Sequence, residues 1–277
     1  MTSDAQLAAL ERLLDDPSPV VRQAVAAHVK AAGTAGILWL EKLAAKAELA
    51  PHAHSLLADL RTVEASAQTF LTYLRSGPID LEEACLLLER VATPSLPPSA
   101  YAAELDRLAA RTRELIAEPL DLRAKCRLLC RVLFGEEGYR GAQESFSAPA
   151  SSLLSQVIST RRGIPISLAV LWLELALGLG LNASGVAFPG HFMLKVTLPK
   201  GQVIIDPFTG QSLSREELSQ RLEPYRQRSG LVDDFEVPLA LYLQAASPRE
   251  IIARMLRNLK EIYMSQEDHA RLIAVLD

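Results

Sequence analysis

The sequence predicts an α+β protein that is mostly helical. Residues 4 to about 76 place Ala and Leu at helical spacing and contain no strand pattern. After an apolar helix at 165–180, three short runs at 183–188, 192–198 and 202–205 are strand-like. We therefore expect a central helix packed on a small antiparallel sheet, with further helices before and after it.

The composition is that of a folded protein. The chain has 277 residues, of which 49% are hydrophobic and 22% are charged. A chain of this length can bury a core without disulfides or a structural metal. Lys and Arg total 29 against 33 Asp and Glu, and the net charge of −4 includes no long run of either sign. We therefore expect neither a nucleic-acid partner nor a membrane partner.

Cysteine usage and the first residues predict a cytoplasmic location. Three cysteines, an odd number, fit a reducing compartment. Residues 1–10 carry no basic region before an apolar stretch, so we expect no secretory signal. The apolar stretch from Leu168 to Leu181 is interrupted only by Glu174 and is shorter than the roughly 20 residues that cross a membrane. It predicts a helix buried in a soluble core.

Residues 1–76 form the first predicted part of the chain. The stretch from Asp15 to Ala24, followed by Gly33, resembles the turn and second helix of a HEAT repeat. Proline fixes the turn, and Arg22 can reach a neighbouring acid. Because one repeat cannot bury its own apolar face, this segment is expected to pack against the rest of the chain or a partner. An ordinary helical subdomain is the alternative.

Gly77-Pro78 marks the start of the predicted core, which covers residues 77–246. Asp80 and Glu83 have the spacing of a helix N-cap and a returning acid, and an apolar run follows them. Two further helices and a polar loop are expected over about 98–117, 120–134 and 135–149. Pro199-Lys200-Gly201 predicts a hairpin turn between the second and third strands.

Residues 247–277 are expected to form a helical hairpin. Ser247 and Glu250 have the spacing of a capping box, with Pro248 at the first helical position. Apolar residues then follow at steps of four and line one face: Ile251, Met255, Leu259 and Tyr263. The second helix of the hairpin would cover 268–277.

Three polar residues interrupt the otherwise apolar region from Gly163 to Phe208. Ser167 lies in the first turn of the buried helix, where free N–H groups and the helix dipole favour developing negative charge. His191 opens one strand and Asp206 closes the next. A nucleophile at a helix start, followed by a base and an orienting carboxylate, is the order of a cysteine-protease-like triad.

Each of these residues also has a structural interpretation. Ser167 could satisfy a helix-terminal N–H, His191 could bridge two strands, and Asp206 could cap a turn before proline. A hairpin turn centred on Lys200 would place Asp206 opposite Leu194, about 10 Å along the strand from His191. Only a bulge, a twist or another register would bring the two together.

Several motifs resemble the SirB1 family, a bacterial group with a transglutaminase-like core and usually a tetratricopeptide tail. They are Tyr139-Arg140-Gly141, Ser152-Leu153-Leu154, the run Arg162-Gly163-Ile164-Pro165-Ile166-Ser167-Leu168, Phe188-Pro189-Gly190-His191-Phe192 and Asp206-Pro207-Phe208. The resemblance covers roughly 79–277. It implies that the hairpin at 247–277 begins a tetratricopeptide-like tail, whereas the HEAT-like segment lies outside the usual pattern.

The resemblance also implies what the triad positions mean. In the wider superfamily a cysteine nucleophile at this helix start is followed by His and Asp, and here Ser167 best matches the cysteine. SirB1-like proteins commonly lack that cysteine. A noncatalytic protein-interaction or regulatory module is therefore the leading expectation, with a protein or peptide as partner. The alternative is an acyl-transfer hydrolase that uses Ser167, His191 and Asp206.

A third possibility is a cleft that binds a small ligand or peptide. It would reuse the groove of the old active site, with Phe188, Phe192 and Phe208 as its apolar walls.

The sequence predicts no metal and no cofactor. Cys85 lies in an apolar helical run and is expected in the core. Cys126 and Cys130 share a helix face, but no other Cys or His pair supplies the four ligands of a structural zinc site. There is no P-loop, dinucleotide glycine motif or zinc-protease helix.

Overall fold

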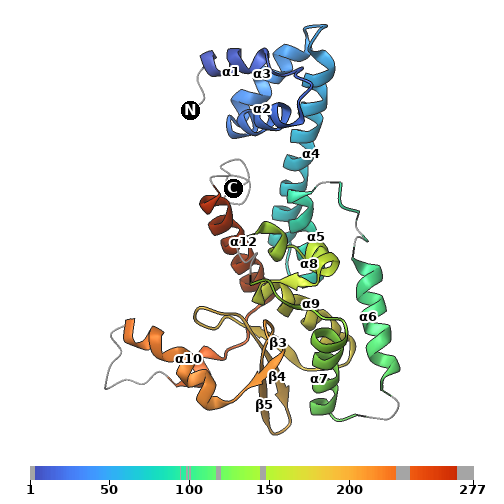
Figure 1. The fold of residues 1–277 in the computed structure, drawn as a ribbon, viewed down its shortest axis with the longest axis vertical. Helices are drawn as coiled ribbons and strands as arrows, with labels where there is room; N and C mark the ends of the chain where they lie inside the picture. The colour runs from blue at the N-terminus through green and yellow to red at the C-terminus, as the bar shows by residue number, and fades with distance from the viewer. Residues whose placement is uncertain are drawn as a thin grey trace. The chain divides into compact units, whose positions relative to one another are not determined.

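The computed structural model confirms the predicted α+β fold (Figure 1). It describes residues 4–93, 95–97, 99, 101–116, 120–143, 148–228 and 238–266. These fall into two compact units: the first contains residues 1–77, 87–96 and 259–277, and the second contains 78–86 and 97–258. The predicted three-part division at residues 76 and 246 stays a prediction.

Four helices build the first unit up to residue 75. They are α1 (Asp4–Glu11), α2 (Pro19–Ala31), α3 (Thr34–Ala44) and α4 (Ala50–Arg75). Both α2 and α4 pack against α3, around a core that includes Val25, Val29 and Leu40. Gly36 makes the α2–α3 approach possible, since a Cβ at this position would lie 2.2 Å from the carbonyl oxygen of Val29.

Five helices in this part of the chain begin close to their predicted positions, at residues 81, 102, 122, 165 and 248, whereas those at 154–160, 215–228 and 239–242 were not predicted. α5 (Leu81–Ala92) and α12 (Pro248–Ser265) contribute residues to both units. Between them lie α6 (Ala102–Glu114), α7 (Leu122–Cys130), α8 (Leu154–Thr160), α9 (Pro165–Gly178), α10 (Arg215–Arg228) and α11 (Leu239–Tyr242). A π-helical turn, η1 (Arg131–Glu136), continues α7.

The segment predicted as a loop contains a short strand. β1 (Arg140–Gly141) pairs in parallel with β2 (Arg162–Gly163), and the 3-10 helix η2 (Pro149–Ser152) follows β1 in the chain. Residues 144–147 of the predicted loop lie outside the described residues.

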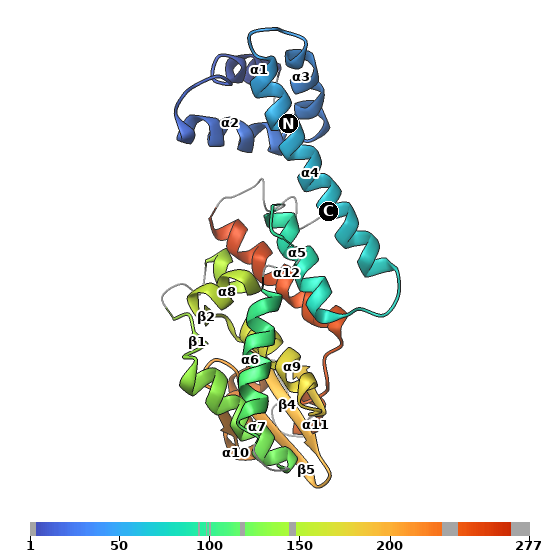
Figure 2. The ribbon, with the colours of Figure 1, turned by 90° about the vertical axis from the view of Figure 1, so that its right-hand side faces the viewer.

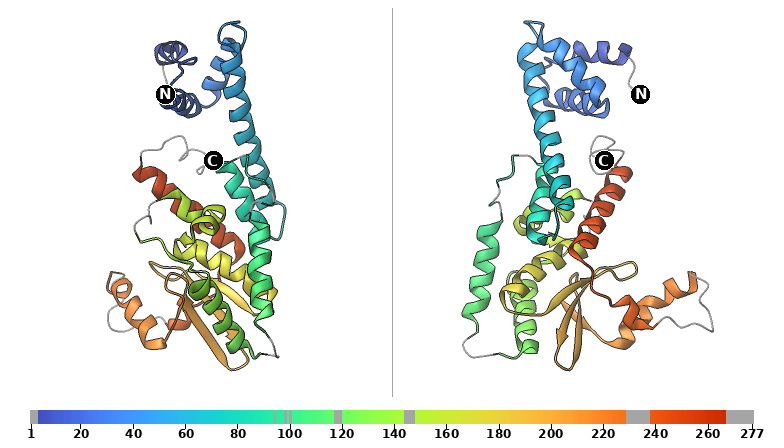
Figure 3. Two further views of the ribbon diagram at one scale, coloured as in Figure 1. Left: turned by 45° about the vertical axis from the view of Figure 1, so that its right-hand side comes forward. Right: turned by 180° about the vertical axis from the view of Figure 1, so that it is seen from behind.

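The main sheet is antiparallel, with its strands in chain order. They are β3 (Ala183–Val186), β4 (Met193–Leu198), β5 (Gly201–Asp206) and β6 (Gln211–Leu213). α9 contacts β3 and β4 as well as α6 and α7 (Figure 2). α10 lies on the other side of the sheet in both views of Figure 3 and packs on it through Leu218 and Leu222.

Burial explains why α9 is apolar on every side. Eleven of its residues are buried, and Trp172 has no exposed surface. A helix that packs against a sheet and other helices has no face left for polar side chains. Among the described residues, no helix combines the length and apolar character needed to cross a bilayer.

Glu174 is the only charged residue of α9, and its environment predicts a measurable pH effect. Burial, together with the nearby carboxylates of Asp80 and Glu82, raises its pKa to about 7. Because the folded state holds this proton more tightly than the unfolded state, stability falls as the pH rises from about 4.5 to 7. We expect Glu174→Gln to raise the free energy of unfolding by about 1–2 kcal/mol at pH 8, after allowance for partial exposure.

The measurement is urea unfolding at pH 8 and at pH 4, where the gain from Glu174→Gln should vanish. Glu216→Gln, in the exposed first turn of α10, is the matched control and should change neither value. An equal gain from Glu174→Gln at both pH values would contradict the assigned cause.

The start of α12 has the predicted capping box. The Ser247 backbone N–H donates to Glu250 Oε2 at 2.7 Å, and the Glu250 N–H donates to Ser247 Oγ at 3.3 Å. The four apolar residues predicted to share a face, at positions 251, 255, 259 and 263, are all buried. The predicted second helix of the hairpin, 268–277, lies outside the described residues.

Candidate active site

Ser167 sits inside the protein, in the first turn of α9. Its hydroxyl has no exposed surface and points at two backbone carbonyls, Ser151 O at 2.7 Å and Ile164 O at 3.0 Å. The Ile164 N–H donates to the same Ser151 carbonyl at 3.1 Å. The hydroxyl therefore ties η2 to the start of α9, and it donates to carbonyls rather than accepting from a helix-terminal N–H.

The structure brings His191 and Asp206 together. His191 Nε2 lies 2.8 Å from Asp206 Oδ1, although His191 precedes the start of β4 by two residues. Of the alternatives left open by the sequence, the structure has another register: Leu194 pairs with Ile205 and not, as a turn centred on Lys200 would require, with Asp206. His191 therefore lies two residues, or about 6–7 Å, along the strand from the position opposite Asp206. The two side chains can span this distance.

The Asp206 carboxylate faces α10 because side chains alternate between the two faces of a strand. Ile204 packs in the cluster that contains Leu218 and Leu222 of α10, and residues two apart on a strand share a face. Arg221 Nη1 of α10 donates to Asp206 Oδ2 at 2.9 Å. Sequence reasoning missed Arg221, because α10 contains several arginines and nothing in their spacing distinguishes this one.

Three donors hold the buried Asp206 carboxylate in its charged form. Burial alone would raise its pKa, but the hydrogen bonds from His191, from Arg221 and from the Phe208 N–H lower the pKa to about 2. The side chain is 3% exposed. A carboxylate that remains ionised in this position can fix the imidazole ring and stabilise it when it takes up a proton.

His191 keeps one ring nitrogen available for chemistry. Its side chain is 23% exposed, and Nε2 bonds to Asp206. If Nε2 carries the proton of that bond, Nδ1 holds a free lone pair, and Nδ1 has no hydrogen-bond partner in the described part of the chain. The ring of Phe208 packs edge-on, with centroids 6.4 Å apart. The pair has the groups of a general base and its orienting carboxylate.

Close packing of glycines shapes the surroundings of His191. A Cβ on Gly141 would lie 2.2 Å from the Phe208 ring, so β1 needs glycine at this position. Gly190 has a φ of 68°, and a Cβ there would lie 1.6 Å from Tyr225 Oη of α10. Gly141 ends the Tyr139-Arg140-Gly141 motif, and Gly190 directly precedes His191 in its motif.

The three phenylalanines predicted to wall a cleft do not share one surface. Phe188 and Phe192 are 1% and 2% exposed and lie in the hydrophobic core. Phe188 packs with residues of β3, β4 and α10, and Phe192 lies against Gly185 of β3. Only Phe208 lies at the edge of the His191–Asp206 pair, so the predicted apolar cleft is not formed by this set.

The cysteines take no part in the hydrogen bonds of Ser167, His191 and Asp206 described above. Cys85 is fully buried in α5, with its sulfur 3.8 Å from the sulfur of Met255. Cys126 and Cys130 are one turn apart on α7. Within the described residues, no group of three or more Cys, His, Asp or Glu side chains is arranged to hold a metal ion.

Comparison with known proteins identifies the core. The family model described as the transglutaminase-like superfamily matches residues 99–257, which include Ser167, His191, Asp206 and Arg221. The chain belongs to this superfamily. The helices α1 to α4 lie outside the matched region of this transglutaminase-like protein.

Its bacterial relatives carry the name UPF0162. It is 36% identical over 190 residues to the UPF0162 protein of Xylella fastidiosa strain 9a5c, covering 67% of this chain and 65% of that relative. It is 31% identical over 196 residues to UPF0162 protein PA3419 of Pseudomonas aeruginosa, covering 71% and 69%. It is 28% identical over 164 residues to UPF0162 protein YchA of Escherichia coli K12, covering 59% of each. No solved structure matches this transglutaminase-like chain.

Proposed function

We propose that this transglutaminase-like chain is a SirB1-like protein without a cysteine nucleophile, and that it acts as a noncatalytic protein-interaction or regulatory module. The observation that carries the proposal is the position of the Ser167 hydroxyl. It is fully buried, and its single proton is shared between two backbone carbonyls within hydrogen-bond distance. The proton that a general base would have to remove is already engaged elsewhere.

The geometry required for serine chemistry supports the same conclusion. A nucleophilic hydroxyl needs a base within about 2.6–3.2 Å, and a substrate must reach its oxygen. Ser167 makes its hydrogen bonds to Ser151 and Ile164, while His191 bonds to Asp206. A substrate could reach the Ser167 oxygen only if η2 and the start of α9 moved apart.

The flanking helices support an interaction role. We infer that α1 to α4 form a HEAT-like segment and that α12 begins a tetratricopeptide-like tail, both being architectures that bind proteins. The three cysteines are free thiols, which supports a cytoplasmic location. The partner is a protein or a peptide rather than a nucleic acid or a membrane.

A fluorophosphonate probe tests the noncatalytic role. We expect no covalent labelling of Ser167 when the folded 277-residue chain is treated with the probe and its peptides are mapped by mass spectrometry. His191→Gln is the informative variant, because His191 is partly exposed and the substitution leaves Ser167 and its buried contacts unchanged. Labelling of Ser167 that disappears in His191→Gln would overturn the proposal.

The alternative function is an acyl-transfer hydrolase. One observation favours it: His191 and Asp206 form the hydrogen-bonded pair that such an enzyme needs, with Nδ1 of His191 unoccupied in the described structure. In this reaction the Ser167 oxygen would attack an acyl carbonyl, and His191 would take the hydroxyl proton and pass it to the leaving group. The fluorophosphonate experiment separates the two functions.

A further inference from the structure

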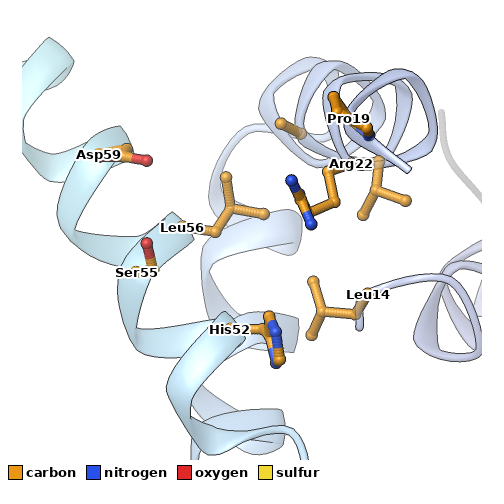
Figure 4. A pocket seen from close by; sticks show the side chains of 9 residues that line it. Leu14, Pro19, Arg22, His52, Ser55, Leu56 and Asp59 are labelled. Atoms are coloured by element: carbon orange, nitrogen blue, oxygen red, sulfur yellow. The ribbon is translucent and has the colours of Figure 1, made fainter. Parts of the chain in front are cut away.

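The first unit contains a groove outside the region matched by the family model. It has a volume of about 340 Å³ and lies between α2 and α4 (Figure 4). Its lining consists of Leu14, Pro19, Arg22, Val25, Ala26, His52, Ser55, Leu56 and Asp59. All nine residues belong to the first unit, so the groove is a property of that unit alone.

Helical spacing explains why three residues of α4 line the same groove. On α4, His52, Ser55 and Asp59 recur at intervals of three and four, which places them on one face. The distance from residue 52 to residue 59 along the helix is about 10 Å. Pro19 and Arg22 start the facing stripe of α2. Residues of both helices line the same groove, so the two stripes face each other across it.

The groove has an apolar floor and a charged rim. Leu14 and Val25, 4% and 2% exposed, provide the floor, and Leu56 forms one wall. Figure 4 shows the Arg22 side chain reaching from α2 into the space faced by Leu14, His52 and Leu56. Asp59 lies on the opposite helix, about two turns beyond His52.

The charged groups of the rim are available to a ligand. One guanidinium nitrogen of Arg22, Nη1, donates to the Asp16 and Pro17 carbonyls, which leaves the other two nitrogens without a partner in the described structure. Asp59 forms no ion pair with any described residue. Arg22 and Asp59 therefore face the apolar groove from opposite sides.

The mixed charge and the openness of the groove favour a peptide. Asp59 would repel a phosphate backbone, and a single arginine is a weak attraction for nucleic acid. An enclosed small-molecule site buries most of its ligand, whereas Arg22, His52, Ser55 and Asp59 are all exposed here. A peptide can place one side chain on the apolar floor while its neighbours meet the rim.

We propose that the groove between α2 and α4 binds a segment of a partner protein in which an apolar side chain lies between an acidic and a basic residue. The acidic residue pairs with Arg22, and the basic residue pairs with Asp59. The apolar side chain occupies the space above Leu14 and Val25. This assignment names the partner class for the interaction role proposed above, and it rests on that role.

A phage-displayed library of random peptides, selected on the 277-residue chain, tests the assignment. We expect the selected peptides to share an apolar residue flanked by opposite charges. Asp59→Lys should weaken their binding about tenfold, and Arg22→Glu should shift selection from acidic towards basic residues. Asp59 is the safer variant for folding because its side chain makes no hydrogen bond to described residues, whereas Arg22 holds the turn before α2.

Arg12→Glu is the matched control, since Arg12 is exposed in the same unit but does not line the groove. It should leave the binding of the selected peptides unchanged. Selection of no common sequence, or peptides whose binding ignores both Arg22→Glu and Asp59→Lys, would overturn the assignment. The noncatalytic role fails separately, through His191-dependent labelling of Ser167, so the two failures are distinguishable.

Discussion

Asp206→Ala is expected to lower the free energy of unfolding of the second unit by about 2–3 kcal/mol at pH 7. The buried carboxylate accepts hydrogen bonds from His191, Arg221 and the Phe208 N–H. Alanine removes all three acceptor contacts and leaves the Phe208 N–H without its side-chain partner. Urea unfolding followed by Trp172 fluorescence, in a Trp39→Phe background, reports on this unit because the chain has two tryptophans.

The same contact predicts a definite pH dependence. The pKa of Asp206 is lowered from 3.8 to about 2, so the folded state binds its proton less readily than the unfolded state. Its stabilising contribution is complete above about pH 5 and is lost as the pH falls from about 4 towards 2. The difference between wild type and Asp206→Ala should narrow over this range. Asp106→Ala, which removes an exposed carboxylate from α6, is the control and should have little effect at any pH.

Gly36→Ala should destabilise the first unit by about 2–3 kcal/mol. Its new Cβ would lie 2.2 Å from the Val29 carbonyl oxygen and 3.0 Å from Val29 Cγ1, so α2 and α3 must separate. The backbone of a helix cannot move aside as a flexible side chain can. Alanine has the higher helix propensity, but the gain of about 1 kcal/mol is smaller than the cost of overpacking.

Hydrogen exchange measures this effect where it arises. We expect faster exchange of the backbone amides in α2 and α3 of Gly36→Ala, together with a lower midpoint urea concentration. Gly135→Ala is the matched control, because its added Cβ would meet only the Arg131 side chain at 3.8 Å. Unchanged protection in α2 and α3 would show that the two helices have room for the extra methyl group.

Local patterns predicted the elements of the core well. The mostly apolar run of α9 indicated a buried helix, and the structure buries eleven of its residues, Trp172 among them. The spacing of Ser247 and Glu250 predicted the hydrogen bonds that begin α12. The capping box depends on residues within one helix, and the burial of α9 depends on its hydrophobicity. Both properties can be read directly from a sequence.

The candidate site could be predicted only in part, because it depends on register and on tertiary contacts. His191 and Asp206 were singled out, but their distance depended on a one-residue difference in hairpin register. Arg221 reaches the site through the packing of α10 on the sheet, which helix periodicity does not reveal. The direction of the Ser167 hydroxyl depends on the carbonyl of Ser151 in η2, 16 residues earlier in the chain.

The discontinuity of the two compact units limits how the protein can be divided or recombined. Residues 87–96 and 259–277 belong with the first unit, although the chain between and around them builds the second. A fragment ending at residue 77 therefore lacks two of the segments with which it is grouped, and a fragment starting at residue 78 carries them without their unit. Genetic exchange at one crossover point therefore cannot transfer either unit whole.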